Sequence, residues 1–119
     1  MAIKQSDLSQ FIGSTQLYSH WLGIQYTDGV KFLAKNGNAY WLIDAIASHQ
    51  TKKLLQIPEL HKFQLWQLTV NSDKSAILTC KPDNNSPEVV SQKIEFSDFP
   101  LPYVSMYLVD KVLMLPSEY

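Results

Sequence analysis

Asp44 is the residue with the clearest reason to take part in chemistry, because it lies inside an otherwise apolar stretch, residues 39–47. Burying a carboxylate in such surroundings costs free energy unless another group pairs with it. The sequence therefore predicts a partner for Asp44. We favour a structural or interface role for this pair, and the alternative is a polar site within an aromatic wall.

The helical register of this stretch separates Asp44 from the nearest histidine. On a helix, Asp44 shares one stripe with Tyr40 and Ser48, whereas His49 follows the neighbouring stripe of Trp41. An Asp–His catalytic pair within the helix is therefore not expected.

The three histidines, His20, His49 and His61, are not spaced as metal ligands. None lies three or four residues from another or from Cys80, so we expect neither a metal nor a cofactor. The alternative is a site assembled from distant parts of the chain, around a pocket between helix and sheet. Its candidate side chains for small-molecule binding or hydrolysis are His20, Asp28, Asp44 and His49.

Cys80 is the single cysteine of the chain. It alternates in register with Ala76 and Leu78, which predicts a buried and unreactive thiol on the core side of a strand. The sequence also lacks a glycine-rich phosphate loop, a GxSxG elbow and an HExxH helix. We therefore favour a protein that is not an enzyme.

Aromatic residues are concentrated in the first third of the chain, at Tyr18, Trp21, Tyr26, Tyr40 and Trp41. All ten basic residues are lysines and the net charge is −1, so the electrostatic half of a nucleic-acid surface is missing. Nucleic-acid binding is accordingly the less favoured alternative, and it would lose affinity steeply with salt. If the aromatic side chains are exposed, they indicate a protein partner.

Composition places these residues in one ordered domain, residues 1–119. A chain of 119 residues with 45% hydrophobic residues can build a single core. Its longest apolar run near the middle, 39–43, is far shorter than the roughly 20 residues of a membrane span. With no apolar leader at the N-terminus and one lone cysteine, a cytoplasmic location is expected.

The first half of the chain is predicted to be helical. Helices are expected over 6–13, over 29–36 with Asp28 as cap and Gly37 at positive φ, and over 39–50 with Asn38 as cap. The last of these is apolar around most of its circumference, which predicts an enclosed central helix. Residues 15–25 fit a helix and a strand about equally, and we favour a helix. Pro58 should stop any helix that continues through 52–56.

The second half is predicted to be a sheet. Short runs rich in β-branched and aromatic residues occur at 63–71, 75–81, 89–97, 103–109 and 112–115, separated by turn-forming residues. The expected fold class is α+β, with N-terminal helices packed on one face of a C-terminal antiparallel meander in two layers.

Several segments resemble a family of short uncharacterised bacterial proteins, a domain of unknown function common in cyanobacteria. The resemblance rests on His20-Trp21, on residues 26–30, on AYWLIDAIASHQ at 39–50 and on LPSEY at 115–119. It implies no catalytic residue. It does imply an accessory role, since such families often accompany mobile elements or phage.

The sequence therefore favours a non-enzymatic module that binds a protein, either another protein or a second copy of itself in a homodimer. The candidate binding residues are Trp21, Tyr26, Asp28, Tyr40, Trp41, Asp44 and His49.

Overall fold

The computed structural model describes residues 16–51 and 54–119, so the helix expected over 6–13 lies outside the described residues. Two nine-residue helices are present, α2 (Asp28–Asn36) and α3 (Tyr40–Ser48). The strands are β1 (Leu17–Ser19), β2 (Gln25–Thr27), β3 (Phe63–Val70), β4 (Ala76–Lys81), β5 (Val90–Ile94), β6 (Tyr103–Val109) and β7 (Val112–Met114). Short 3-10 helices follow at η1 (Leu54–Gln56), η2 (Pro58–Leu60) and η3 (Pro116–Glu118).

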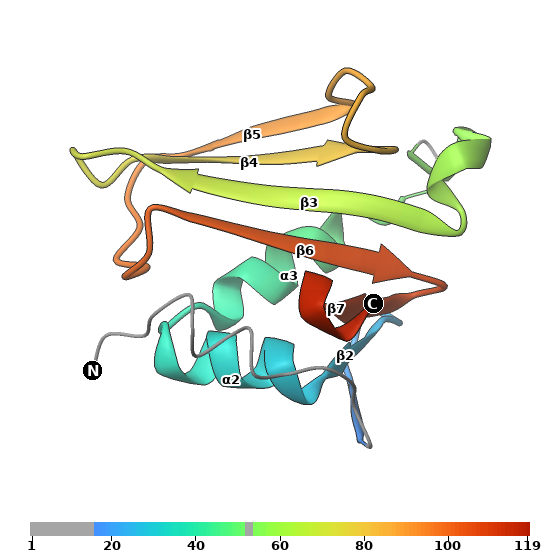
Figure 1. The fold of residues 1–119 in the computed structure, drawn as a ribbon, viewed down its shortest axis with the longest axis horizontal. Coiled ribbons are helices and arrows are strands. Elements are labelled where there is room, and N and C mark those ends of the chain that lie inside the picture. The colour runs from blue at the N-terminus through green and yellow to red at the C-terminus, as the bar shows by residue number, and fades with distance from the viewer. Residues whose placement is uncertain (1–15, 52–53) are drawn as a thin grey trace.

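The described strands form one mixed sheet in the order β1-β2-β7-β6-β3-β4-β5. All pairings are antiparallel except that between β2 and β7, which is parallel. Figure 1 shows α2 and α3 on the same side of the strands, near β6 and β7. Within the described part of the chain, neither helix is long and apolar enough to span a bilayer.

This topology makes the predicted arrangement of N-terminal helices on a C-terminal meander wrong. The N-terminal segment contributes two strands to the sheet instead of covering it. The strand order also departs from sequence order, because β6 pairs with β3 and β7 pairs with β2. Hydrogen bonding between segments far apart in the chain decides this order, and no local pattern encodes it.

The helix favoured over 15–25 is also wrong, because residues 17–27 form the hairpin of β1 and β2. Gly23 adopts a φ of +96° in the connecting loop, a conformation that glycine accepts without steric cost. The loop is closed by backbone hydrogen bonds between His20 and Ile24, 2.8 Å, and from Gly23 to His20, 3.0 Å. Long-range pairing of β2 with β7 then favours the extended form.

The helices α2 and α3 were placed correctly, but their caps differ from those predicted. Thr27, rather than Asp28, caps α2, with its hydroxyl accepting a hydrogen bond from the Val30 N–H at 3.3 Å. Gly37 has a φ of −96°, and the neighbouring Asn38 takes the left-handed conformation at +52°. The Asn38 side chain donates to Asp98 instead of capping α3.

The core is a cluster of buried side chains from both helices and from the sheet. α3 contributes Leu42, Ile43, Ile46 and Ala47, and its other face is open to solvent at Tyr40, Asp44 and Ser48. The prediction of a fully enclosed helix is therefore wrong. The expected strands β3 to β7 lie within a few residues of their predicted limits, and Trp66 and Leu68 of β3 face the core.

Candidate functional site

His20 and Asp44 join the β1–β2 loop to α3. Nε2 of His20 lies 2.6 Å from Oδ1 of Asp44. Nδ1 of His20 accepts a hydrogen bond from the Leu22 N–H at 3.1 Å, so the proton of the neutral ring is on Nε2 and is donated to Asp44. The His20 side chain is 7% exposed and the Asp44 side chain is 61% exposed. Asp44 therefore has the expected partner, although it lies at the surface of the helix rather than in the core.

Trp21 extends from this loop into solvent. Its side chain is 81% exposed, and its ring stacks on that of His20 with centroids 5.8 Å apart. The contact with His20 anchors the base of an exposed indole, because His20 is itself hydrogen-bonded on both ring nitrogens.

Two tyrosines of the hairpin extend the same surface. Tyr18 and Tyr26 stack with ring centroids 5.6 Å apart, and the Tyr18 hydroxyl donates to Asp28 at 2.9 Å. This hydrogen bond raises the pKa of Tyr18 above its usual range. Burial, and next the nearby Tyr40 and Asp44, raise the pKa of Tyr26.

We call this group of side chains the Trp21 surface. It comprises Tyr18, His20, Trp21, Tyr26, Tyr40 and Asp44. Tyr40 is 46% exposed at the start of α3. The surface thus combines exposed aromatic rings with a carboxylate that is held in place.

The remaining predicted site residues lie elsewhere or play structural roles. Trp41 is half-buried and packs against the core. His49 follows α3, pairs with Gln92 of β5 at 2.7 Å and tilts against Trp66. Asp28 is at the start of α2, where it accepts the bond from Tyr18.

A hydrogen bond joins two of the four residues considered for hydrolysis, His20 and Asp44. Asp44 meets His20, whereas the hydrogen bonds of Asp28 and His49 lead to Tyr18 and Gln92. Acid–base catalysis needs such groups around one reacting atom, and these hydrogen bonds of Asp28 and His49 do not lead to the His20–Asp44 pair. Among the described residues, no three His, Cys, Asp or Glu side chains are grouped closely enough to hold a metal ion.

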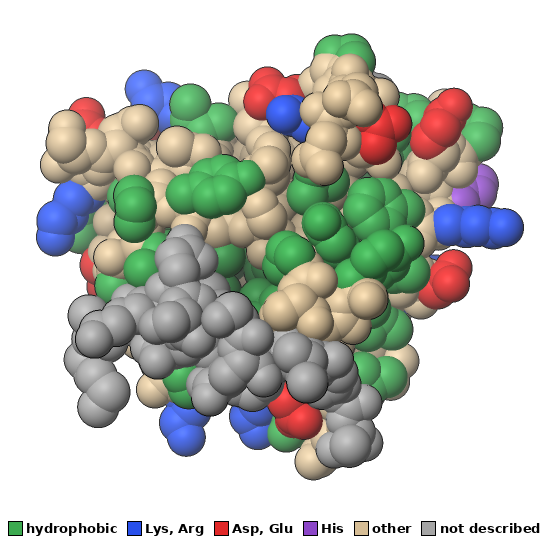
Figure 2. Space-filling view, viewed as in Figure 1, with side chains coloured by type: hydrophobic (Ala, Val, Ile, Leu, Met, Phe, Trp, Pro, Cys, Tyr) green, Lys and Arg blue, Asp and Glu red, His purple; other side chains and the backbone are tan. Residues whose placement is uncertain are grey.

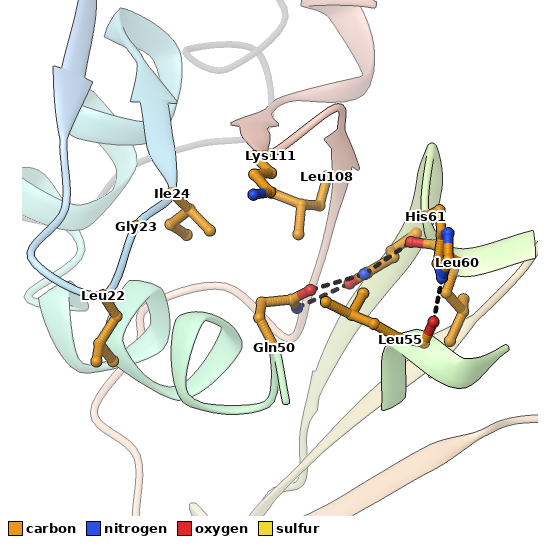
Figure 3. Close-up of a pocket in the computed structure, with 10 residues that line it drawn as sticks. Leu22, Gly23, Ile24, Gln50, Leu55, Leu60, His61, Leu108 and Lys111 are labelled. Carbon is orange, nitrogen blue, oxygen red and sulfur yellow. Dashed lines mark hydrogen bonds between the residues drawn. The ribbon is translucent and has the colours of Figure 1, made fainter. Parts of the chain in front are cut away.

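A cavity of about 570 Å³ opens next to the β1–β2 loop (Figure 3). Its lining comes from this loop, the end of α3, the 3-10 helices, β3 and the β6–β7 hairpin. It consists of Leu22, Gly23, Ile24, Gln50, Leu55, Leu60, His61, Gln64, Leu108 and Lys111. None of the predicted site residues is among them. Sequence reasoning missed this cavity because five separate segments form it.

A hydrogen-bonded amide pair, buried Gln64 and half-buried Gln50, forms one wall of the cavity. Gln64, 2% exposed, exchanges two hydrogen bonds with Gln50, both 2.8 Å, and its oxygen also accepts from the Trp66 indole N–H at 2.8 Å. The Gln64 amide nitrogen also donates to the Leu60 carbonyl. A glutamine at a core-facing strand position was the one local signal of this network in the sequence.

A second aromatic cluster lies on another part of the molecule. The rings of Phe63, Tyr107 and Tyr119 contact one another with centroids 5.0 to 5.7 Å apart. Figure 2 shows hydrophobic side chains gathered on the side where the chain's C-terminal residues lie. Tyr119 is 72% exposed, but two aromatic rings contact it, whereas the Trp21 indole stacks on His20 alone among the described rings.

The chain belongs to a family of unknown function, DUF6876, whose model matches residues 2–119. The match covers almost the whole chain and confirms the resemblance to a family of unknown function. No curated protein and no solved structure matches the chain significantly.

Proposed function

We propose that the protein is a non-enzymatic interaction module that binds a protein through the Trp21 surface. The observation that carries the proposal is the 81% exposure of Trp21 on a loop that the His20–Asp44 hydrogen bond fixes to α3. Exposing an indole to water is unfavourable, and tryptophan and tyrosine are the residues most often found at the energetic centres of protein interfaces. A fixed loop also loses little conformational entropy on binding.

The partner is another protein or a second copy of this chain. A net charge of −1 supports self-association, because two copies repel each other only weakly. The proposal includes a cytoplasmic location, which the lone free thiol of Cys80 supports. It also includes the bacterial, especially cyanobacterial, distribution and the association with mobile elements or phage that the family resemblance implies.

The test compares Trp21→Ala with Phe96→Ala. Phe96 is 66% exposed and outside the Trp21 surface, so it is a matched control for loss of an exposed aromatic ring. Sedimentation of the wild type and both variants measures self-association. Trp41→Ala is a poor probe because Trp41 packs against the core.

If the wild type is monomeric, a photoreactive amino acid at position 21 identifies a partner in cells, and binding is then measured with purified proteins. Loss of a central tryptophan should weaken binding about 30-fold, and Phe96→Ala should leave it unchanged. A monomer that yields no cross-linked partner, or equal loss in both variants, would overturn the proposal.

A further inference from the structure

The cavity beside the β1–β2 loop has the dimensions and composition of a ligand site. Its volume of about 570 Å³ lies within the range of roughly 300–1,000 Å³ that is typical of small-molecule sites. Figure 3 shows Gln50 between Ile24 on one side and Leu55 on the other, with Leu108 and Lys111 opposite. The cavity is distinct from the Trp21 surface, since no residue of that surface lines it.

The walls of the cavity are aliphatic. Leucine and isoleucine side chains supply its apolar part, and the described lining residues include no aromatic ring other than His61. The set is Leu22, Ile24, Leu55, Leu60 and Leu108. Such walls suit a flexible alkyl chain better than a planar ring system, which would use stacking partners.

The charge at the cavity is positive. Lys111 is exposed at its rim, and among the described residues its ammonium group is in no ion pair. The Lys111 carbonyl accepts a hydrogen bond from the Gln25 N–H at 2.9 Å, which fixes the backbone from which the side chain extends. No aspartate or glutamate is among the described lining residues. An anionic group is therefore favoured near Lys111.

The wall formed by Gln50 and Gln64 offers the cavity one hydrogen-bond acceptor. Gln64 uses both amide protons and both lone pairs of its oxygen within the protein. Gln50 donates to the Ile46 carbonyl and to Gln64, and its oxygen accepts one bond from Gln64, which leaves a second lone pair. The glutamine pair therefore presents little unsatisfied polarity, and most of the cavity favours apolar groups.

We infer that this cavity binds an amphiphilic monocarboxylate, with the carboxylate at Lys111 and an aliphatic chain along the leucine and isoleucine walls. The hydrogen bond from the Leu22 N–H to His20 holds the loop that forms one wall. The site is therefore shaped before the ligand arrives.

Calorimetric titration of the full chain with hexanoate, octanoate and decanoate, below micelle-forming concentrations, tests the apolar half of the site. Each added methylene that becomes buried should raise the affinity about fourfold. Decanol tests the charged half and should bind about threefold more weakly than decanoate, because an exposed ion pair contributes little. Affinity that is independent of chain length, or equal for decanol and decanoate, would overturn the inference.

Variants at two matched lysines locate the site. Lys111 and Lys74 are both in hairpin turns with a φ of +69°. Replacing either lysine with methionine therefore imposes the same backbone strain. Lys111→Met should lower decanoate affinity about threefold and leave decanol affinity unchanged, whereas Lys74→Met should change neither. Equal losses in the two variants would show attraction to the surface in general and would rule out the site.

A substitution in the aliphatic wall of the cavity gives a second measurement of ligand binding. Leu55→Trp adds bulk at a half-buried position and should weaken both decanoate and decanol, provided that circular dichroism shows the fold intact. If this variant does not fold, the lysine pair still decides the question. The result is independent of the proposed protein partner, because Trp21 does not line the cavity and Lys111 is not part of the Trp21 surface.

Discussion

The ring of His20 bridges two elements, with Nε2 2.6 Å from Oδ1 of Asp44 and Nδ1 accepting from the Leu22 N–H. One side chain thereby fixes both the wall of the cavity and the base of the exposed Trp21. This relationship connects the two candidate sites structurally, although their chemistry differs.

Replacing Asp44 with alanine should loosen the β1–β2 loop. The His20 side chain is 7% exposed, so its N–H would lose its acceptor with limited access to water, at a cost of about 1 kcal/mol. Urea unfolding measures this cost, and hydrogen exchange at the Leu22 amide reports the loop itself. Asp98→Ala is the control, because Asp98 accepts an exposed bond from Asn38, and its cost should stay below about 0.5 kcal/mol. Equal exchange at Leu22 in both variants would contradict the expectation.

Trp21 should dominate the solvent-quenchable fluorescence of the protein. Trp66 is fully buried and Trp41 is half-buried, whereas Trp21 is 81% exposed. Trp21→Phe should therefore remove most of the quenching by iodide and change the free energy of unfolding by less than about 0.5 kcal/mol. Quenching that persists in the variant would show that the indole is covered in solution.

Glu118 and Gly29 should be energetically coupled. The Glu118 carboxylate accepts hydrogen bonds from the Thr27 hydroxyl at 2.6 Å, the Leu115 N–H at 3.0 Å and the Gly29 N–H at 3.3 Å. A Cβ at position 29 would lie 2.5 Å from Glu118 Oε1 and 2.8 Å from Leu115 Cδ1. Each of Gly29→Ala and Glu118→Ala should destabilise the protein by about 1–3 kcal/mol.

The double variant is the critical measurement for this pair. Because both single changes disrupt the same contact, the double variant should lose less stability than the sum of the two, by about 1 kcal/mol. Chemical denaturation of all four proteins gives the coupling. Strict additivity would show that Glu118 and Gly29 act independently.

Cys80 should control stability in mild alkali. Burial raises the pKa of the Cys80 thiol from its usual value of 9.0 to about 12. The unfolded thiol ionises above pH 9 and the folded one does not, so stability should be unaffected by this group below pH 9 and should fall between pH 9 and about 12. The slope approaches about 1.4 kcal/mol per pH unit.

Cys80→Ala should remove the part of this slope between pH 9 and 10, whatever its effect on stability at pH 7. Tyr18 and Tyr26, whose pKa values are also raised, ionise in the unfolded state only near pH 10. Denaturation at several pH values separates the two contributions. An unchanged slope in the variant would mean that the thiol is not protected by burial.

The limits of β3 to β7 could be predicted because each strand carries its own alternating pattern. The turns between these strands could also be predicted from neighbouring residues. Both Asp110 and Lys111 take the positive φ that a tight reversal needs. The burial of Cys80 followed from its alternation with Ala76 and Leu78. In these segments neighbouring residues in the sequence decide the structure.

The N-terminal hairpin and the strand order could not be predicted in this way. Tyr26 pairs with Tyr18 on one side and with Leu113 on the other, and the second pairing joins distant parts of the chain. A three-residue strand is too short to show a clear period. The sequence predicted that Asp44 has a partner. It could not predict which residue this is, because the hairpin determines where His20 lies.

The parallel pairing of β2 with β7 has a consequence for how the molecule acquires its structure. Antiparallel pairing of β3, β4 and β5 requires only neighbouring segments, whereas β2 stays without its inner neighbour until Val112 and Leu113 have been synthesised. Contacts of such high sequence separation slow folding, because a long loop must close before they form. On the ribosome, the hairpin that carries Trp21 is therefore among the last parts of the sheet to be secured.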